Sequence, residues 1–217
     1  MIELILKGGL SYLLGSIMGS LAIARLTGGV DIRTLGSGNA GATNALRTLG
    51  KKVALAVLLI DLAKGWIATG VVATWGLPAG IPAASAALAA WSTPVCGIAV
   101  VLGHLYPLWF GFRGGKGVAT LLGAVLGISP WLLLPMILAW LVAVIAFGYV
   151  GLASILGAFT LVVVIALTHL GTPLLAFGIL SALLILYAHR SNLARMRAGT
   201  ESRARRLWLF GTRRGHA

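Results

Sequence analysis

Hydrophobic and polar positions follow each other along the chain in long blocks rather than in short alternations. A run of about 20 apolar residues is the length that an α-helix needs to cross the hydrocarbon core of a bilayer. The sequence contains seven candidate runs, at roughly 3–25, 53–75, 82–107, 116–129, 131–148, 153–169 and 173–188. The fourth run is short, which fits a tilted or partly re-entrant helix.

Breaks between the runs coincide with prolines, which end or begin helices, at positions 78, 82, 130 and 173. The connections at 76–81, 129–131, 149–152 and 170–172 are short, so neighbouring helices are expected to lie antiparallel. The pattern predicts an all-α membrane bundle that forms one domain over residues 1–217. A flexible basic tail is expected from about residue 203 to residue 217.

Composition agrees with a membrane protein. The 217 residues are 59% hydrophobic and 10% charged, whereas a soluble domain is about a quarter charged. The single cysteine, Cys96, excludes an internal disulfide framework. A cleaved signal peptide is not expected, because Glu3 precedes the first apolar run and that run is too long for a signal core.

The basic residues predict the orientation in the membrane. All of the 17 Lys and Arg residues except Lys7 and Lys64 fall between runs one and two, between runs three and four, or after run seven. By the positive-inside rule this side is cytoplasmic, which puts the amino terminus outside and the carboxyl terminus inside. The net charge of +13 therefore reflects topology, with attraction to anionic lipids in addition, and nucleic-acid binding is excluded for lack of a recognition motif.

The first polar stretch on this side, Leu35–Arg47, reads L-G-S-G-N-A-G-A-T-N-A-L-R. Its glycines can turn backbone N–H groups toward an anion, and a helix that opens at Asn44 favours phosphate or carboxylate. Arg47, one turn later, can add a bidentate contact. A simple tight connection is the alternative, but the density of Ser, Asn, Thr and Arg favours an anion-binding loop.

The same stretch formally matches the dinucleotide-binding fingerprint G-x-G-x-x-G, and Asp61 follows Gly41 by 20 residues. That fingerprint requires a preceding strand in a soluble βαβ unit. Here an apolar run precedes the loop and Asp61 lies inside the next one, so dinucleotide binding is rejected.

The second polar stretch, Gly103–Thr120, reads G-H-L-Y-P-L-W-F-G-F-R-G-G-K-G-V-A-T. Arg113 and Lys116 flank a glycine pair where the fourth run begins, so a cation and free N–H groups share a helix start. It is not a Walker A loop, because glycine follows Lys116. Trp109 stands where an H-x-x-x-x-D acyltransferase motif starting at His104 requires aspartate. On spacing alone, the two cations also fit a purely topological role.

The third polar stretch, Tyr187–Arg203, places His189 and Asn192 three residues apart, on one face of a continuing helix. The histidine also fits a simple hydrogen-bonding role at the interface. Asp61 and Lys64 form an i, i+3 pair inside the second run, where charges are costly and indicate function. A structural pair in which each charge neutralises the other explains them equally well.

Together these segments resemble the motifs of the bacterial acyl-phosphate:glycerol-3-phosphate acyltransferases of the PlsY type. The three polar stretches are similar to the family's three motifs in the right order, and D-L-A-K-G at Asp61–Gly65 is similar to its intramembrane D-x-x-K-G. The resemblance covers the whole chain. Ala40 replaces a common proline and Arg113 a common lysine, and neither change removes a chemical group of interest.

The resemblance implies seven membrane helices in a bacterial inner membrane, with the active site facing the cytoplasm. It implies transfer of a fatty acyl group from acyl phosphate to the 1-position of glycerol 3-phosphate, which yields lysophosphatidic acid and phosphate. Transient contact with the soluble enzyme that makes acyl phosphate and a monomeric state are expected. Acyl phosphate carries a good leaving group, so no covalent intermediate, cofactor or metal is expected, and Cys96 has no nucleophilic role.

The resemblance also assigns roles to residues. Ser37, Arg47 and Lys116 would hold the phosphates and the developing oxyanion, with the N–H groups of Gly38, Gly115 and Gly117. His189 and Asn192 would orient the acceptor, and the proton of its hydroxyl would go to His189 or to the donor's own phosphate. The further substrate-binding residues are expected to be Asn39, Thr43, Asn44, His104 and Ser154, the last of which also fits a helix-packing role.

Two other classes compete with the enzyme. A small transporter or channel for an anionic solute would show repeats and polar breaks near the middle of the bilayer, whereas the polar signal here lies at one face. A lipid-binding scaffold would depend on the basic tail and not on the glycine-rich loops. Turnover of substrate by protein in detergent, without compartments, separates the enzyme from both.

Overall fold

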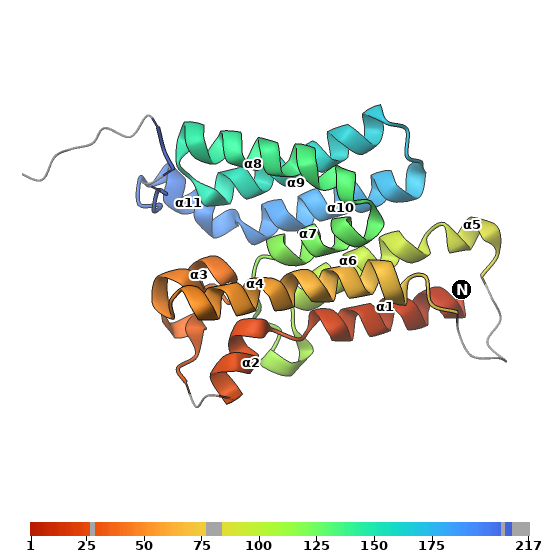
Figure 1. Cartoon of the computed structure of the whole chain (residues 1–217), viewed down its shortest axis with the longest axis horizontal. Helices are drawn as coiled ribbons and strands as arrows, with labels where there is room; N and C mark the ends of the chain where they lie inside the picture. The colour runs from red at the N-terminus through yellow and green to blue at the C-terminus, as the bar shows by residue number, and fades with distance from the viewer. Residues whose placement is uncertain (27–28, 77–83, 205–206, 210–217) are drawn as a thin grey trace, which may run out of the picture.

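The computed structural model describes residues 1–26, 29–76, 84–204 and 207–209. Most of the connection predicted at 76–81, the start of the third predicted run, and Arg205, Arg206 and residues 210–217 of the predicted tail lie outside this part of the chain. Within it, the secondary structure is helical throughout, as the apolar blocks predict (Figure 1).

The described residues of the first half of the chain form seven helical elements. They are α1 (Ile2–Gly15), α2 (Gly19–Leu26), the short 3-10 helix η1 (Ile32–Thr34), α3 (Ala42–Thr48), α4 (Lys51–Trp66), its π-helical continuation η2 (Ile67–Val72) and α5 (Ala86–Ala89). The second half comprises α6 (Ser92–Leu105), η3 (Leu108–Phe110), α7 (Val118–Ile128), η4 (Pro130–Leu132), α8 (Leu133–Phe147), α9 (Val150–Leu167), α10 (Thr172–Ala188) and α11 (Arg190–Arg197).

Every predicted apolar run contains at least one of these helices, and two sharp bends occur, one inside the first run and one directly after the seventh run, which α10 fills. The first run divides into α1 and α2, which are bent by 52°, and α10 continues into α11 with a bend of 51°. In the described part of the chain, four helical stretches are long and apolar enough to cross a membrane, or six if each bent pair is one span. With only 11 residues, or about 16 Å at 1.5 Å per residue, α7 is shorter than a bilayer core. The count of seven spans stays a prediction.

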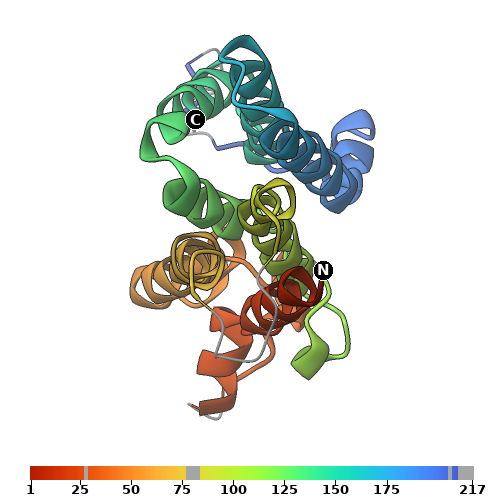
Figure 2. The ribbon, with the colours of Figure 1, turned by 90° about the vertical axis from the view of Figure 1, so that its right-hand side faces the viewer.

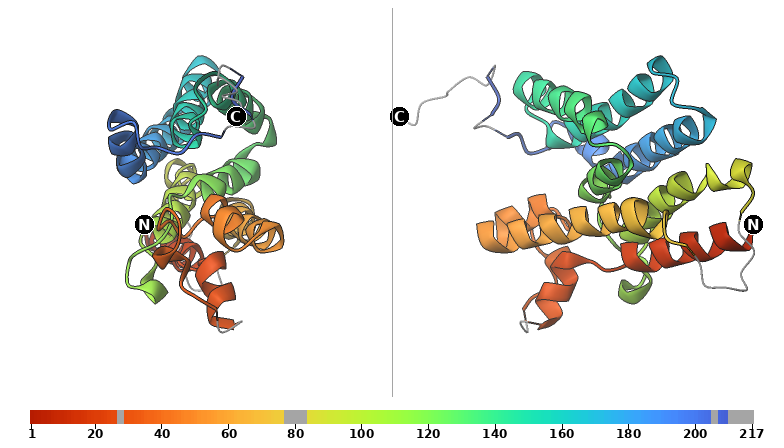
Figure 3. Two further views of the ribbon diagram at one scale, coloured as in Figure 1. Left: turned by 90° about the vertical axis from the view of Figure 1, so that its left-hand side faces the viewer. Right: turned by 45° about the vertical axis from the view of Figure 1, so that its right-hand side comes forward.

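The helices form two groups with a shared centre. In Figure 2, α8, α9 and α10 lie above and α1, α2 and α4 lie below, while α6 and α7 lie between them. The packing follows this arrangement, since α6 contacts both α1 and α10, and α7 packs along α4. Figure 3 shows α3 at one end of the bundle and the N-terminus of the chain at the other.

Close packing of α7 on α4 depends on glycine. A Cβ atom at Gly65 would overlap the carbonyl oxygen of Thr120, and one at Gly123 would overlap that of Leu62. Small residues let helix backbones approach in a membrane, where dispersion contacts replace the hydrophobic effect as the source of helix association. This contact fixes the first turn of α7, which begins two residues after Lys116.

The outer face of the bundle is apolar. On α8, Leu134, Leu138 and Val142 are exposed and recur every four residues, so they form one stripe along the helix. A continuous exposed apolar stripe of this kind is typical of a surface that faces lipid.

Candidate active site

The three polar stretches meet at a cavity of about 750 Å³ between the two helix groups. Its polar wall comes from the loop before α3, the start of α7 and the α10–α11 junction. Its apolar wall comes from α4, α7, α8, α9 and α10, with Leu58, Leu121, Leu122, Met136, Ile137, Trp140, Val150, Ala158 and Ile185. Such a cavity suits a ligand with a charged head and an apolar tail.

A second cavity, of about 480 Å³, adjoins the first. Ser37, Asn39 and Lys116 line both cavities, and Gly38 and Gly115 line the second. Arg113 and Arg190 add positive charge to the second cavity. The residues shared by the two cavities are therefore placed to contact two anionic ligands at once.

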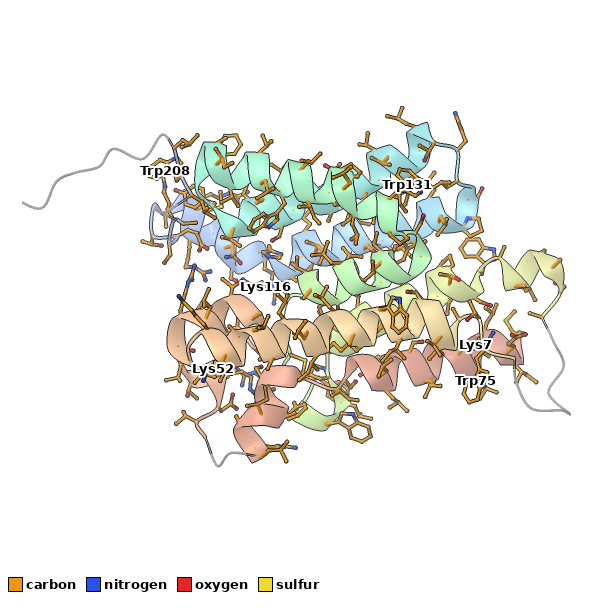
Figure 4. All side chains as sticks on the ribbon, in the orientation of Figure 1. Lys7, Lys52, Trp75, Lys116, Trp131 and Trp208 are labelled. Carbon is orange, nitrogen blue, oxygen red and sulfur yellow. The ribbon has the colours of Figure 1, made fainter. Side chains whose placement is uncertain are left out.

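Lys116, labelled in Figure 4, begins a chain of polar contacts that links the start of α7 to α11 and the segment after it. Its Nζ donates a hydrogen bond to Oδ1 of Asn192 on α11. Asn192 Nδ2 in turn donates to Glu201 Oε1 at 2.7 Å, and Arg195 Nε donates to Glu201 Oε2 at 2.6 Å. These contacts hold the Lys116 ammonium at the junction of the two cavities.

Glu201 and Arg195 are site residues that the sequence reasoning missed, although both lie in the third polar stretch. They are six residues apart, which is no regular helical spacing. The chain turns back after α11, so that the N–H groups of Thr200 and Glu201 both donate to the carbonyl oxygen of Arg195. Only this reversal brings the carboxylate to Asn192.

The surroundings of Lys116 favour its neutral form. Burial lowers the pKa of its ammonium from the usual 10.5 to about 8, and the positive charges of Arg195 and Arg47 act in the same direction. The carboxylate of Glu201 opposes this shift. The ammonium is therefore still charged at neutral pH, where it can bind a phosphate oxygen.

His189 lies between α10 and α11 and lines the large cavity. Its Nδ1 is 2.8 Å from the carbonyl oxygen of Ile185. A carbonyl oxygen only accepts, so Nδ1 carries the proton and Nε2 keeps its lone pair. Burial lowers the pKa of the imidazole to about 4, and the nearby Lys116 charge adds to this effect. The ring is neutral at pH 7, with Nε2 able to accept a proton or a hydrogen bond.

Asn44 has a different position from the one expected. The sequence reasoning made it the opening residue of a helix, but α3 begins at Ala42 after Gly41, so that prediction was wrong. The Asn44 side chain is buried and accepts a bond from the Ser37 amide at 3.0 Å. Its Nδ2 donates to Ile32 O at 3.2 Å and to Leu35 O at 2.9 Å.

Because both amide protons of Asn44 serve the loop itself, none is left for a phosphate oxygen. The residue lines the cavity but braces the turn that presents Ser37. Ser37, Thr43 and Arg47 also line the cavity, and within the described ranges their side chains have no hydrogen-bond partner. These three and Lys116 are side-chain donors of the large cavity that remain open to an anion.

The three glycines expected to supply N–H groups differ from one another. The Gly38 amide donates to Leu35 O at 3.0 Å, and the Gly115 amide donates to His104 O at 3.1 Å. Neither amide is free for a phosphate, which corrects the expectation for these two. Gly117 has φ +79°, a left-handed conformation, and directly precedes the first turn of α7, where amide groups have no partner within the helix.

Two further predicted residues lie at the cavity with their polar atoms engaged. The Ser154 hydroxyl donates to Val150 O at 2.9 Å and accepts from Trp140 Nε1 at 3.4 Å, so only acceptor capacity is left. His104 is 3% exposed, and its Nδ1 lies 3.0 Å from Thr120 Oγ1. Asn39 lines both cavities, and its role in substrate binding stays a prediction.

The intramembrane pair of Asp61 and Lys64 is an ion pair at 2.9 Å. Lys64 Nζ also donates to Gly15 O at 3.0 Å and to Ile17 O at 2.8 Å, at the break between α1 and α2. Two carbonyl oxygens and the paired carboxylate surround the ammonium, which supports the structural interpretation of the pair. Among the residues that the structure describes, no group of three His, Cys, Asp or Glu side chains is placed to hold a metal ion.

Comparison with known proteins agrees with these observations. A family model described as glycerol-3-phosphate acyltransferase matches residues 5–199. Curated relatives named glycerol-3-phosphate acyltransferase include one from Aquifex aeolicus, 42% identical over 193 residues and covering 89% of this chain and 95% of the relative. One from Bordetella pertussis is 44% identical over 201 residues, covering 89% of this chain and 88% of the relative.

Among solved structures, a crystal structure of PlsY, described as an integral membrane glycerol 3-phosphate acyltransferase in its glycerol 3-phosphate form, superposes with a TM-score of 0.81. It is 38% identical, and the match covers 92% of this chain and 94% of PlsY. The lysophosphatidic acid form of the same protein gives a TM-score of 0.79 with the same identity and coverage.

Proposed function

Since the chain belongs to the glycerol-3-phosphate acyltransferase family, we propose that it moves a fatty acyl group from acyl phosphate to the 1-position of glycerol 3-phosphate. It is an integral membrane enzyme that acylates glycerol 3-phosphate. The products would be lysophosphatidic acid and inorganic phosphate, in the first acylation of bacterial phospholipid synthesis.

One observation carries the donor assignment. The large cavity joins an apolar wall to a cluster of phosphate-suited donors, and Lys116 stands where this cavity meets the second, polar one. An acyl phosphate can place its tail against Trp140 and Leu122 and its phosphate at Arg47, Ser37 and Lys116. The water-soluble acceptor approaches from the polar side.

In the proposed step, the hydroxyl oxygen at position 1 of glycerol 3-phosphate attacks the acyl carbonyl carbon. The carbonyl oxygen becomes an oxyanion, which the Lys116 ammonium and the amide of Gly117 stabilise. The bond from carbon to the phosphate oxygen then breaks, and phosphate leaves with the electron pair. Positioning and charge stabilisation suffice for so reactive a donor.

The proton of the attacking hydroxyl has two possible acceptors. His189 Nε2 is unprotonated and lines the cavity, so it can accept the hydrogen bond and the proton. The departing phosphate can also take the proton, in which case His189 orients the hydroxyl. Asn192, held by Lys116 and Glu201, orients the acceptor beside it.

The remaining parts of the proposal concern the setting of the enzyme. We place seven spans in the bacterial inner membrane, with the amino terminus outside, the carboxyl terminus inside and the cavity facing the cytoplasm. The distribution of Lys and Arg supports this orientation. The whole chain acts as one domain and as a monomer, and it takes acyl phosphate from the soluble enzyme that produces it.

The test is phosphate release by purified protein in detergent with palmitoyl phosphate, with and without glycerol 3-phosphate. Release that depends on the acceptor, with lysophosphatidic acid as product, is expected. Lys116→Met should lower kcat/KM by about 100-fold or more, the usual effect of removing an oxyanion stabiliser. Lys52→Met, which removes an exposed lysine at the start of α4, serves as the matched control.

Two results would contradict the proposal. Turnover with palmitoyl-CoA but not with palmitoyl phosphate would refute the donor. An equal loss of folded protein in Lys116→Met would refute the catalytic role of Lys116.

A further inference from the structure

A buried polar network links the break between α1 and α2 to the loop that carries Lys116. It starts at Lys64 on α4, which donates to the carbonyl oxygens of Gly15 and Ile17 and pairs with Asp61. Lys64 and Asp61 are 3% and 1% exposed. The proposed chemistry uses neither residue.

The network continues to His104 near the end of α6. Its Nδ1 is 3.4 Å from Asp61 Oδ1 and 3.0 Å from the hydroxyl of Thr120 on α7. Side chains from α4 and α7 therefore contact one edge of the imidazole ring that α6 carries. With polar partners from two of its neighbours, the ring has one fixed orientation.

The opposite edge of the ring faces Gly115, the residue before Lys116. A Cβ atom at Gly115 would overlap Nε2 of His104, and the three nearest atoms to that position all belong to the imidazole. The backbone adds two bonds, since the Gly114 amide donates to Leu105 O and the Gly115 amide to His104 O, both at 3.1 Å. The loop thus rests on His104.

We propose that His104 is a positioning residue, not a phosphate ligand: its ring seats the Gly115 peptide and thereby aims the Lys116 ammonium at Asn192 and the junction of the two cavities. Asp61 and Thr120 hold the ring in place for this purpose. The inference rests on the proposed role of Lys116 in acyl transfer.

Two considerations support this assignment over direct binding. Nδ1 of His104 faces Thr120 and Asp61, and the Nε2 edge of the ring faces the Gly115 backbone, so the imidazole is directed at the loop that carries Lys116. A displacement of about 1 Å in a charge-stabilising group can cost about 100-fold in rate. A ring that only supports a backbone can therefore be as necessary as one that touches substrate.

The contact offers a size-exchange experiment. Gly115→Ala adds a methyl group where Nε2 lies, and the alanine is compatible with the backbone because Gly115 is not among the glycines with positive φ. His104→Asn keeps a polar atom near Nδ1 for Asp61 and Thr120 but removes the Nε2 edge. Gly115→Ala alone makes the methyl group clash with the ring, and His104→Asn alone leaves a gap beside Gly115. In the double variant the alanine methyl group fits into the space that the shorter asparagine leaves.

We expect Gly115→Ala to lower kcat/KM for glycerol 3-phosphate by about 100-fold. His104→Asn should lower it by about 10-fold. The double variant should be within about threefold of His104→Asn, because residues in contact are not additive. A double variant whose loss equals the product of the two single losses would overturn the inference.

Controls separate this outcome from general damage. Gly9→Ala adds a methyl group that meets no atom within 4 Å. His169→Asn changes an exposed histidine at the far end of the bundle, where φ +52° suits asparagine. Both should keep wild-type kcat/KM, and thermal unfolding should show that all variants are folded. A folded wild-type protein without acyl-phosphate turnover would refute the proposed function itself, whereas active wild type with no rescue refutes only the role of His104.

Discussion

At the scale of single residues, the site depends on two ionisable groups whose pKa burial lowers. Lys116 has a pKa of about 8 and His189 one of about 4. The lysine binds anions in its protonated form, which predominates below pH 8. The histidine accepts a proton in its neutral form, which predominates above pH 4. The interval between the two values is where both groups are in their active form.

The basic side of the pH profile should report Lys116. We expect kcat/KM to fall as pH rises through about 8, by up to tenfold per unit, because the neutral amine no longer holds phosphate. Lys116→Arg should remove this fall, since a guanidinium stays protonated over the whole pH range of the assay. The measurement is phosphate release between pH 6.5 and 10 in the two proteins. A fall that persists in Lys116→Arg would assign it to another group.

The acidic side should report His189. At saturating substrate, kcat should stay level down to about pH 5 and fall only as pH approaches 4, where the imidazole gains its second proton. Measurement of kcat is preferred over kcat/KM, because phosphate groups themselves titrate near pH 6. A fall of kcat centred near 6.5 would show an imidazole with its ordinary pKa and would contradict the burial of this ring.

At the scale of helices, the break between α1 and α2 has its carbonyl groups satisfied by a side chain from another helix. The last carbonyls of α1 have no partner within the helix, and Lys64 from α4 supplies one for Gly15 and for Ile17. The ammonium that satisfies them is itself neutralised by Asp61. The pair therefore braces α1, α2 and α4 at the level of the site.

Removal of one partner of the Asp61–Lys64 ion pair should destabilise the protein more than removal of the charge on both partners. Lys64→Met leaves the Asp61 carboxylate buried beside carbonyl oxygens and should cost about 3–5 kcal/mol. Asp61→Asn combined with Lys64→Met should unfold at a higher temperature than Lys64→Met alone, because no unpaired charge remains. Thermal unfolding in detergent measures this, with Lys51→Met, an exposed lysine of the same helix, as control. Equal unfolding temperatures for the single and double variants would contradict an ion-pair role.

At the scale of the whole molecule, two helix groups enclose a cavity that is apolar on one side and charged on the other. The loops that carry the charge lie at one end of the bundle, with Lys116 and Lys52 toward that end and Lys7 and Trp75 at the other (Figure 4). An enzyme that joins a membrane-dissolved donor to a soluble acceptor needs this arrangement, because the reaction must take place where the two phases meet.

The orientation can be tested by cysteine labelling. The one native cysteine, Cys96, is fully buried and gives little background. A membrane-impermeant maleimide should label Gly76→Cys in intact cells and should label Lys52→Cys only in inverted vesicles. Labelling of Lys52→Cys in intact cells would reverse the proposed topology, while a lack of labelling at both positions in detergent would show that the sites are inaccessible.

The sequence predicted the helices and the three polar stretches, because apolar blocks and clustered glycine, polar and basic residues are local signals. The sequence also predicted that the three stretches lie on one side of the membrane, because the distribution of Lys and Arg follows from membrane insertion. It did not predict the breaks at residues 16–18 and 189, because the group that satisfies the first break, Lys64, lies far away along the chain.

The roles within the site divide in the same way. Lys116, His189, Ser37 and Arg47 were recognisable from their own stretches, and the tertiary structure leaves their key atoms at the cavity. The roles of Asn44, His104 and Glu201 depend on contacts that only the tertiary structure makes. A hydrogen-bonding group serves either the fold or a ligand, and which of the two depends on partners that only folding brings within reach.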